Sequence, residues 1–197
     1  MTPRLSSLWA AAIGAAITLL VALPAAQAHD FDPERQVMVQ VGPDYMDVLI
    51  FYSEAPGERS DLFAAQFGLH LDDQLGDLLA DVAGRAFLPR VMDGLQFEVP
   101  GESPRTDQPE VQLRLRGEQI QAAAFARFHL EELSPDEERQ VIVRAKDRSF
   151  IPTPVIIYGD DHLSLTSVGQ GLEHQSDVAT GTLDRGQQLE ATFGFQP

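Results

Sequence analysis

Cysteine is absent from the 197-residue sequence, and tryptophan and lysine occur once each, as Trp9 and Lys146. Without cysteine the chain can form no disulfide bond, and it offers no thiolate as a metal ligand or nucleophile. A lipoprotein anchor, which requires a cysteine, is excluded for the same reason. A chain of this length can still bury enough apolar surface to fold as one domain without disulfides.

Positive charge is also scarce. The chain has 14 lysine and arginine residues against 30 aspartate and glutamate residues, which gives a net charge of -16. So acidic a chain repels nucleic acids and anionic membrane surfaces, and we expect neither as a partner. The surplus of carboxylates favours solubility, including in a salty habitat, and attracts cations only diffusely.

The common catalytic motifs are missing as well. The sequence contains no G-x-S-x-G, no H-E-x-x-H and no phosphate-binding glycine loop. Thirty acidic residues produce some carboxylate pairs by chance, so their presence does not indicate a glycosidase. None of these patterns indicates a particular reaction, and we predict that the protein is not an enzyme.

The N-terminus has the three parts of a secretory signal peptide. Arg4 supplies positive charge, residues 8–23 form an apolar run, and Pro24 ends it. Small residues at Ala26 and Ala28 fit the specificity of a signal peptidase. The apolar run is short and wrongly flanked for a membrane span, and no later segment is apolar enough for one. We therefore predict cleavage at Ala28-His29 and a single exported domain, 29–197, that is periplasmic or secreted.

Alternation of apolar and polar residues dominates the rest of the chain, which is typical of β-strands. Residues 35–41 and 45–55 flank a Gly42-Pro43-Asp44 turn signal and predict a β-hairpin. Further strands are expected at 95–99, 110–117, 121–133, 139–147, 153–159 and 162–168, with the segment 121–133 also open to a short helix. Short strands with turn signals between them predict a mainly β protein, an antiparallel β-sandwich of the immunoglobulin-like kind.

One segment departs from this alternation. Between residues 58 and 93 the apolar residues recur every three or four positions, which predicts two helices at 58–67 and 73–93. Pro89 is expected to kink or end the second helix. This pair forms a two-helix insertion after the first hairpin. Beyond it, the glycine-interrupted tail, residues 181–195, is compatible with a last hairpin.

The connection between these helices, FGLHLDDQLG at 67–76, has the outline of an EF-hand calcium loop. On that template the four ligand positions fall on Gly68, His70, Asp72 and Leu79. Only Asp72 is a suitable oxygen ligand, and Asp73 replaces the usual glycine. Acidic residues here also suit the start of a helix, so we interpret the stretch as a degenerate EF-hand kept as scaffold.

The order of segments is similar to that of a known family. AHD follows the predicted leader, and RQVMVQVGPDYMDVLIFY, the acidic helix–loop–helix, AGRAFLPRVMDGLQFEV, VQLRL and VIVRAKDRSFIPTPVIIYGDDHLSL come in turn. This order resembles the extracytoplasmic N-terminal domain of HupE/UreJ-type and nickel/cobalt-exporter-like permeases over residues 28–168. The resemblance implies a stand-alone version of an accessory domain to a metal or small-ion permease. Transport is not implied, because the loop ligands are mostly missing and no hydrophobic region follows.

His29 is the strongest candidate metal ligand. After cleavage it would present an α-amine and an imidazole, which with a second imidazole suit Cu(II) or another divalent metal. His162 or His129 could supply the second imidazole, and Asp30 and Asp32 lie beside His29. The alternative is that a histidine at a mobile terminus has no chemical role.

Two further patterns allow a metal site or a structural role. In the GDDH segment, 159–162, Asp161 and His162 offer a carboxylate and an imidazole, although glycine and aspartate also suit a hairpin turn. Met38 and Met46 fall on the two strands of the first hairpin and could form a thioether pair for Cu(I). Methionines also pack well in a core.

Three functions therefore remain open. The leading hypothesis is a non-catalytic periplasmic binding or interaction protein, with a membrane permease as its partner through sheet edges or the helical insertion. The alternative is a periplasmic copper or divalent-metal carrier that uses His29. An unrecognised hydrolase is the weakest of the three.

Overall fold

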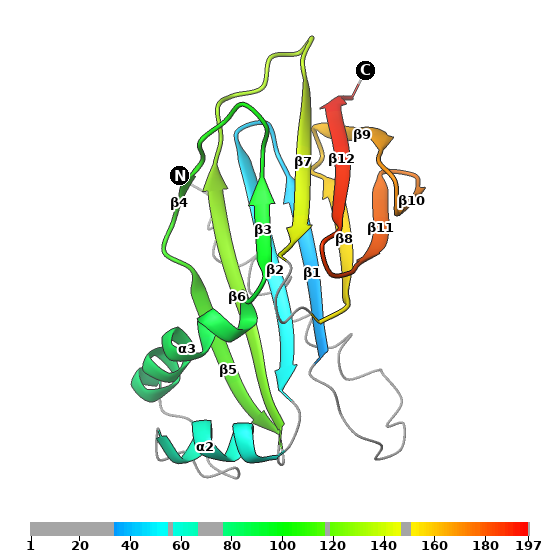
Figure 1. The fold of residues 1–197 in the computed structure, drawn as a ribbon. Coiled ribbons are helices and arrows are strands. Elements are labelled where there is room, and N and C mark those ends of the chain that lie inside the picture. The colour runs from blue at the N-terminus through cyan, green and yellow to red at the C-terminus, as the bar shows by residue number, and fades with distance from the viewer. Residues whose placement is uncertain (1–33, 55–56, 67–76, 117–118, 147–150, 197) are drawn as a thin grey trace. The chain divides into compact units, whose positions relative to one another are not determined.

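The computed structural model describes residues 34–54, 57–66, 77–116, 119–146 and 151–196. Two β-sheets account for most of this part of the chain, and two short helices follow the second strand (Figure 1). The sheets pack on each other through a shared apolar core, so the predicted β-sandwich with a small helical insertion is confirmed.

The larger sheet has eight strands. They are β1 (Glu34–Val41), β2 (Tyr45–Glu54), β4 (Arg105–Thr106), β5 (Glu110–Arg116), β6 (Gln119–His129), β8 (Thr153–Gly159), β10 (Leu172–Gln175) and β11 (Val178–Leu183). Their order is β10-β11-β8-β1-β2-β6-β4, and β5 also pairs with β6. The two strands from the first half of the sequence, β1 and β2, therefore lie in the middle of this sheet, with strands from the second half on both sides.

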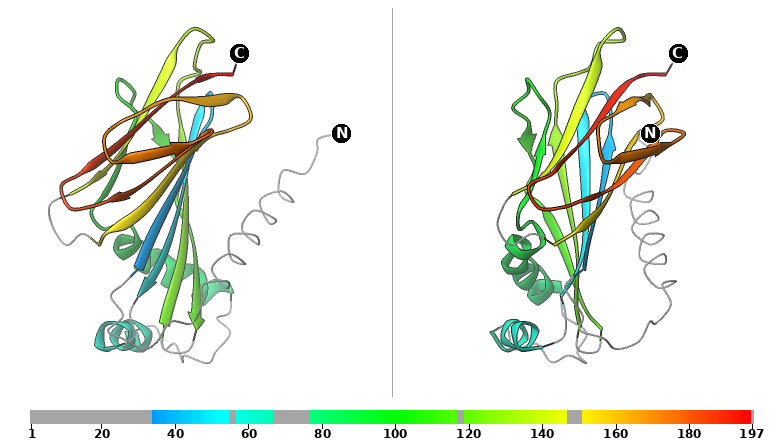
Figure 2. Two further views of the ribbon diagram at one scale, coloured as in Figure 1. Left: turned by 90° about the vertical axis from the view of Figure 1, so that its right-hand side faces the viewer. Right: turned by 45° about the vertical axis from the view of Figure 1, so that its right-hand side comes forward.

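The smaller sheet has four antiparallel strands. They are β3 (Leu95–Glu98), β7 (Glu138–Ala145), β9 (Leu163–Val168) and β12 (Gln188–Phe195). Their order is β3-β7-β12-β9, and Figure 2 shows this layer stacked on one face of the larger sheet.

The predicted first hairpin is confirmed. β1 and β2 pair antiparallel from Glu34 opposite Ser53 to Val41 opposite Met46. The segment with two possible assignments, 121–133, forms strand β6 rather than a helix. One strand pair departs from the expected antiparallel arrangement, because β1 also pairs parallel with β8.

The C-terminal segment completes both sheets. β11 pairs with β8 in the larger sheet, and β12 lies between β7 and β9 in the smaller one. The expectation of a last hairpin over 181–195 is therefore wrong, since the two strands of that segment belong to different layers. The expectation failed because an alternating pattern does not specify the neighbours of a strand. β11 lies between β10 and β8, and β12 lies between β7 and β9.

The insertion consists of α2 (Glu58–Gln66) and α3 (Asp77–Val91). Pro89 lies in the last turn of α3 without ending it, two residues before the helix stops. α3 packs mainly on β5, and Gly84 allows this approach: a Cβ atom there would lie 2.9 Å from the Val111 carbonyl oxygen. The helix thus takes the place of the smaller sheet over this part of the larger one.

The core lies between the layers and follows the predicted alternation. Most inward-facing positions of β1, β2, β6, β7 and β8 are valine, isoleucine, alanine or methionine, and these side chains are almost completely buried. α3 contributes Ala83, Phe87 and Val91 to the same core, and the Phe87 ring meets the Tyr52 ring edge-on. Within the described residues, no helix is long and apolar enough to cross a membrane.

A buried arginine ties the insertion to the sandwich. Arg35, on an inward position of β1, donates from Nε to Thr153 Oγ1 at 3.0 Å and from Nη1 to the Asp93 carbonyl at 2.6 Å. The same Nη1 lies 3.4 Å from the Val91 carbonyl at the end of α3. A cation at this end of a helix also interacts favourably with the helix dipole. Burial lowers the pKa of Arg35, and Asp93 opposes that shift.

Candidate functional site

The connection between β8 and β9 carries two predicted metal ligands. Asp161 and His162 are both exposed there. The Leu163 amide donates to the Asp160 carbonyl at 3.3 Å, so the structural interpretation of residues 159–162 as a turn is confirmed. The turn does not close a hairpin, because it passes from the larger sheet to the smaller one. Asp160 holds this corner: its side chain accepts from the His162 amide at 2.9 Å and from the Tyr45 hydroxyl at 3.1 Å.

The other predicted ligands are not brought together by the described structure. His29 and the EF-hand-like loop 67–76 lie outside the described residues. His129 Nε2 lies 2.9 Å from Asp107 Oδ2, which gives that imidazole a carboxylate partner on the surface. Across the described ranges, no group of three or more metal-ligating side chains is gathered closely enough to hold an ion.

The proposed methionine pair is not formed. Met46 faces the core opposite Val41, whereas Met38 pairs with Leu49 and lies on the other face of the same sheet. Successive residues of a strand point to opposite faces, so the sheet separates the two sulfur atoms. A Cu(I) site of these two residues is therefore wrong.

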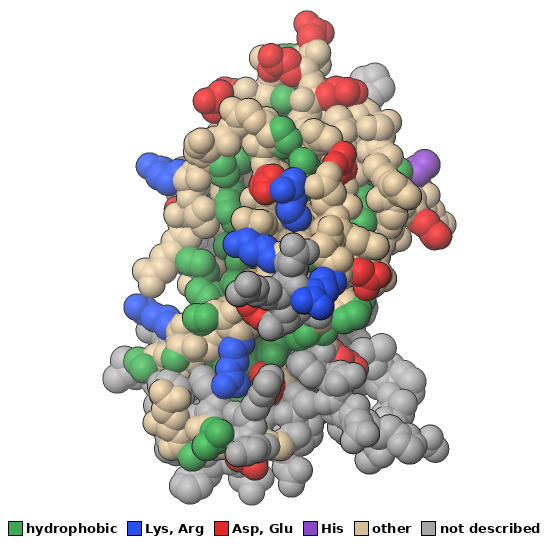
Figure 3. Space-filling model, viewed as in Figure 1, with side chains coloured by type: hydrophobic (Ala, Val, Ile, Leu, Met, Phe, Trp, Pro, Cys, Tyr) green, Lys and Arg blue, Asp and Glu red, His purple; other side chains and the backbone are tan. Residues whose placement is uncertain are grey.

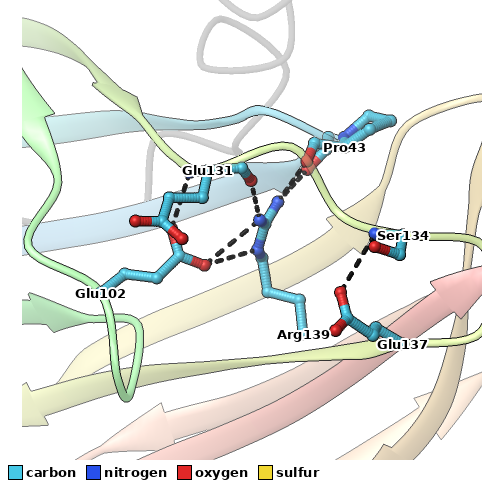
Figure 4. Close-up of polar contacts among 7 residues, drawn as sticks. Pro43, Glu102, Glu131, Ser134, Glu137 and Arg139 are labelled. Atoms are coloured by element: carbon cyan, nitrogen blue, oxygen red, sulfur yellow. Dashed lines mark hydrogen bonds and ion pairs between the residues drawn. The ribbon is translucent and has the colours of Figure 1, made fainter.

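The most developed polar cluster surrounds Arg139, which sequence reasoning missed (Figure 4). Nη1 donates to the carbonyls of Gly42 and Pro43 at 2.9 and 2.7 Å. Nε and Nη2 both lie 3.2 Å from Glu102 Oε1, and Nη2 also donates to the Glu131 carbonyl. One buried guanidinium thus joins the β1–β2 turn, the β3–β4 loop and the β6–β7 connection.

A pocket of about 280 Å³ adjoins this cluster. Glu131, Glu132, Glu137 and Glu138 line it, together with apolar side chains such as Leu133. Acidic side chains also gather at the top of the view in Figure 3, where the β6–β7 connection lies. All three nitrogens of Arg139 have partners, so the arginine braces the loops around the pocket and is not available to an incoming anion.

A second ion pair lies on the outer face of the larger sheet, the face opposite the smaller sheet. Arg127 binds Asp47 through two hydrogen bonds of 2.7 and 2.6 Å, and its guanidinium lies 4.7 Å from the centre of the Tyr45 ring. The hydrogen bonds to Asp47 raise the pKa of Arg127. Burial, followed by the charge of Asp160, raises the pKa of the Tyr45 hydroxyl. These contacts fix the side chains in place.

The same outer face carries a row of apolar side chains. Ile156, Met38, Leu49 and Phe125 lie on neighbouring strands, and each is the cross-strand partner of the next. All four are partly buried. α3 and the smaller sheet pack on the opposite face of these strands.

The sheet edges carry features that oppose addition of a further strand. β3, β4 and β10 have four residues or fewer, and the pairing of β9 with β12 shifts register at Thr192 and Phe193. α3 packs against β5, the longest of the edge strands. The edges of the described sheets are therefore poorly suited to pairing with a strand of another chain.

The helical insertion exposes apolar side chains on its outer surface. On α3, Val82, Ala86 and Pro89 are exposed at a spacing of four and three residues, and Val82 is 49% accessible. This apolar stripe lies opposite the core-facing Ala83 and Phe87. On α2, Leu62 is 63% accessible, the highest value for a large apolar side chain among the described residues.

The arginine clusters left a signal in the sequence. Arg139 and Arg35 each occupy a position where the alternation of their strand calls for an inward apolar residue. A charged residue at an inward position requires a set of buried partners. The pattern could have identified both arginines, but most of the carbonyl groups that they bind come from segments distant in sequence.

No protein-family model matches the chain, and no curated protein matches it either. The similarity to the permease-associated domain therefore remains a prediction that rests on the order of segments.

Proposed function

We propose that the protein is an exported, non-catalytic interaction protein that binds its partner through the helical insertion. The observation that carries this proposal is the apolar stripe of α3: Val82, Ala86 and Pro89 face away from the core that the opposite side of the helix fills. A helix that is apolar on opposite faces is normally covered on both. Exposed Leu62 extends the apolar character of the insertion to α2.

The resemblance of the chain suggests the kind of partner. An accessory of a metal or small-ion permease would bind an extracytoplasmic part of that membrane protein, and an apolar stripe suits a lasting protein contact. The net charge of -16 favours a partner whose surrounding surface is basic. Leader cleavage at Ala28-His29 and a periplasmic location belong to the same proposal.

The test is a capture experiment with mature protein, residues 29–197, immobilised and exposed to detergent-solubilised membranes of the source organism. We expect a polytopic permease to be retained by the unaltered protein and lost when Val82 and Ala86 are both replaced by glutamate. Val178→Glu is the matched control, because Val178 is a similarly exposed apolar residue (37% accessible) on β11, away from the insertion.

Both variants change exposed positions, so we expect their unfolding free energies to remain within about 0.5 kcal/mol of the parent for each substitution. Retention of the same permease by the Val82→Glu, Ala86→Glu protein would overturn the assignment of the insertion. Failure of the unaltered protein to retain any membrane protein would overturn the accessory role itself.

A further inference from the structure

We draw no further inference here: the strongest candidate, the apolar row of Ile156, Met38, Leu49 and Phe125 on the outer face of the larger sheet, carries nothing because nothing in the structure shows what covers it.

Discussion

The loops around Arg139 and the helical insertion differ in how fully the rest of the protein covers or pairs their side chains. Around Arg139, each nitrogen of the buried guanidinium has a carboxylate or carbonyl partner, so these polar groups bind one another within the protein. On α3, one face is buried in the core while Val82 and Ala86 remain exposed. A saturated polar cluster stabilises the fold, whereas an uncovered apolar stripe is a surface to which another molecule can bind.

Removal of the central arginine should have the largest effect on stability. Arg139→Met leaves the Glu102 carboxylate and the carbonyls of Gly42, Pro43 and Glu131 without their shared donor, and we expect a loss of about 3–5 kcal/mol in unfolding free energy. Equilibrium denaturation in urea measures this loss.

Arg144→Met is the control, since Arg144 lies on the same strand but pairs with Glu98 at 3.5 Å where both side chains are about 40% accessible. That change should cost about 0–1 kcal/mol. Equal losses in the two variants would show that Arg139 does not brace the loops.

A substitution between α3 and β5 tests how closely the insertion is held to the sandwich. Gly84→Val places a branched side chain where even a Cβ atom would lie 2.9 Å from the Val111 carbonyl oxygen. We expect a loss of about 1–3 kcal/mol, because the helix must move away from the strand.

Ala86→Val enlarges a side chain two residues away on the exposed face of the same helix and should change stability by about 0.5 kcal/mol or less. Thermal unfolding of both variants provides the measurement. A Gly84→Val protein as stable as the Ala86→Val protein would mean that α3 can shift on β5 without cost.

The burial of the tyrosines leads us to expect a loss of stability at alkaline pH. All three, Tyr45, Tyr52 and Tyr158, have a raised pKa, in each case chiefly because burial disfavours the phenolate. Tyr52 also donates to Glu54 at 2.8 Å, and the Glu54 charge adds to its shift. A group whose pKa is higher in the folded state gives stability that is fully present below the unfolded value, about 10, and is lost as the pH rises toward the folded value.

We therefore expect the native protein to show little tyrosinate absorbance at a pH of about 10–11, the range in which the tyrosines of the urea-unfolded chain ionise. The unfolding free energy should fall across the same range. If the tyrosines of the native protein ionised over the same pH range as those of the unfolded chain, that result would contradict the burial of these hydroxyls.

The sequence predicted elements with a clear period better than it predicted their partners. The alternation in β1 and β2 set the first hairpin and its inward face, and the three- to four-residue spacing marked α3. Alternation gives no information on which sheet a strand joins, and for this reason β11 and β12 were wrongly expected to pair. The cluster around Arg139 was missed because its partners are mainly backbone carbonyls, which any residue supplies.

The smallest expected effect concerns metal binding, whose predicted ligands belong neither to the loops around Arg139 nor to the helical insertion. If the protein acts through its insertion, replacing His29 or His162 by alanine should leave Cu(II) binding to mature protein weak and salt-sensitive, as expected for diffuse attraction by a charge of this size. Isothermal titration of Cu(II), Ni(II) and Ca(II) into each variant and its parent makes the comparison. Tight, stoichiometric Cu(II) binding that disappears in His29→Ala would instead favour the metal-carrier function. Persistence of that binding in His162→Ala would then place the second ligand elsewhere than at the exposed His162.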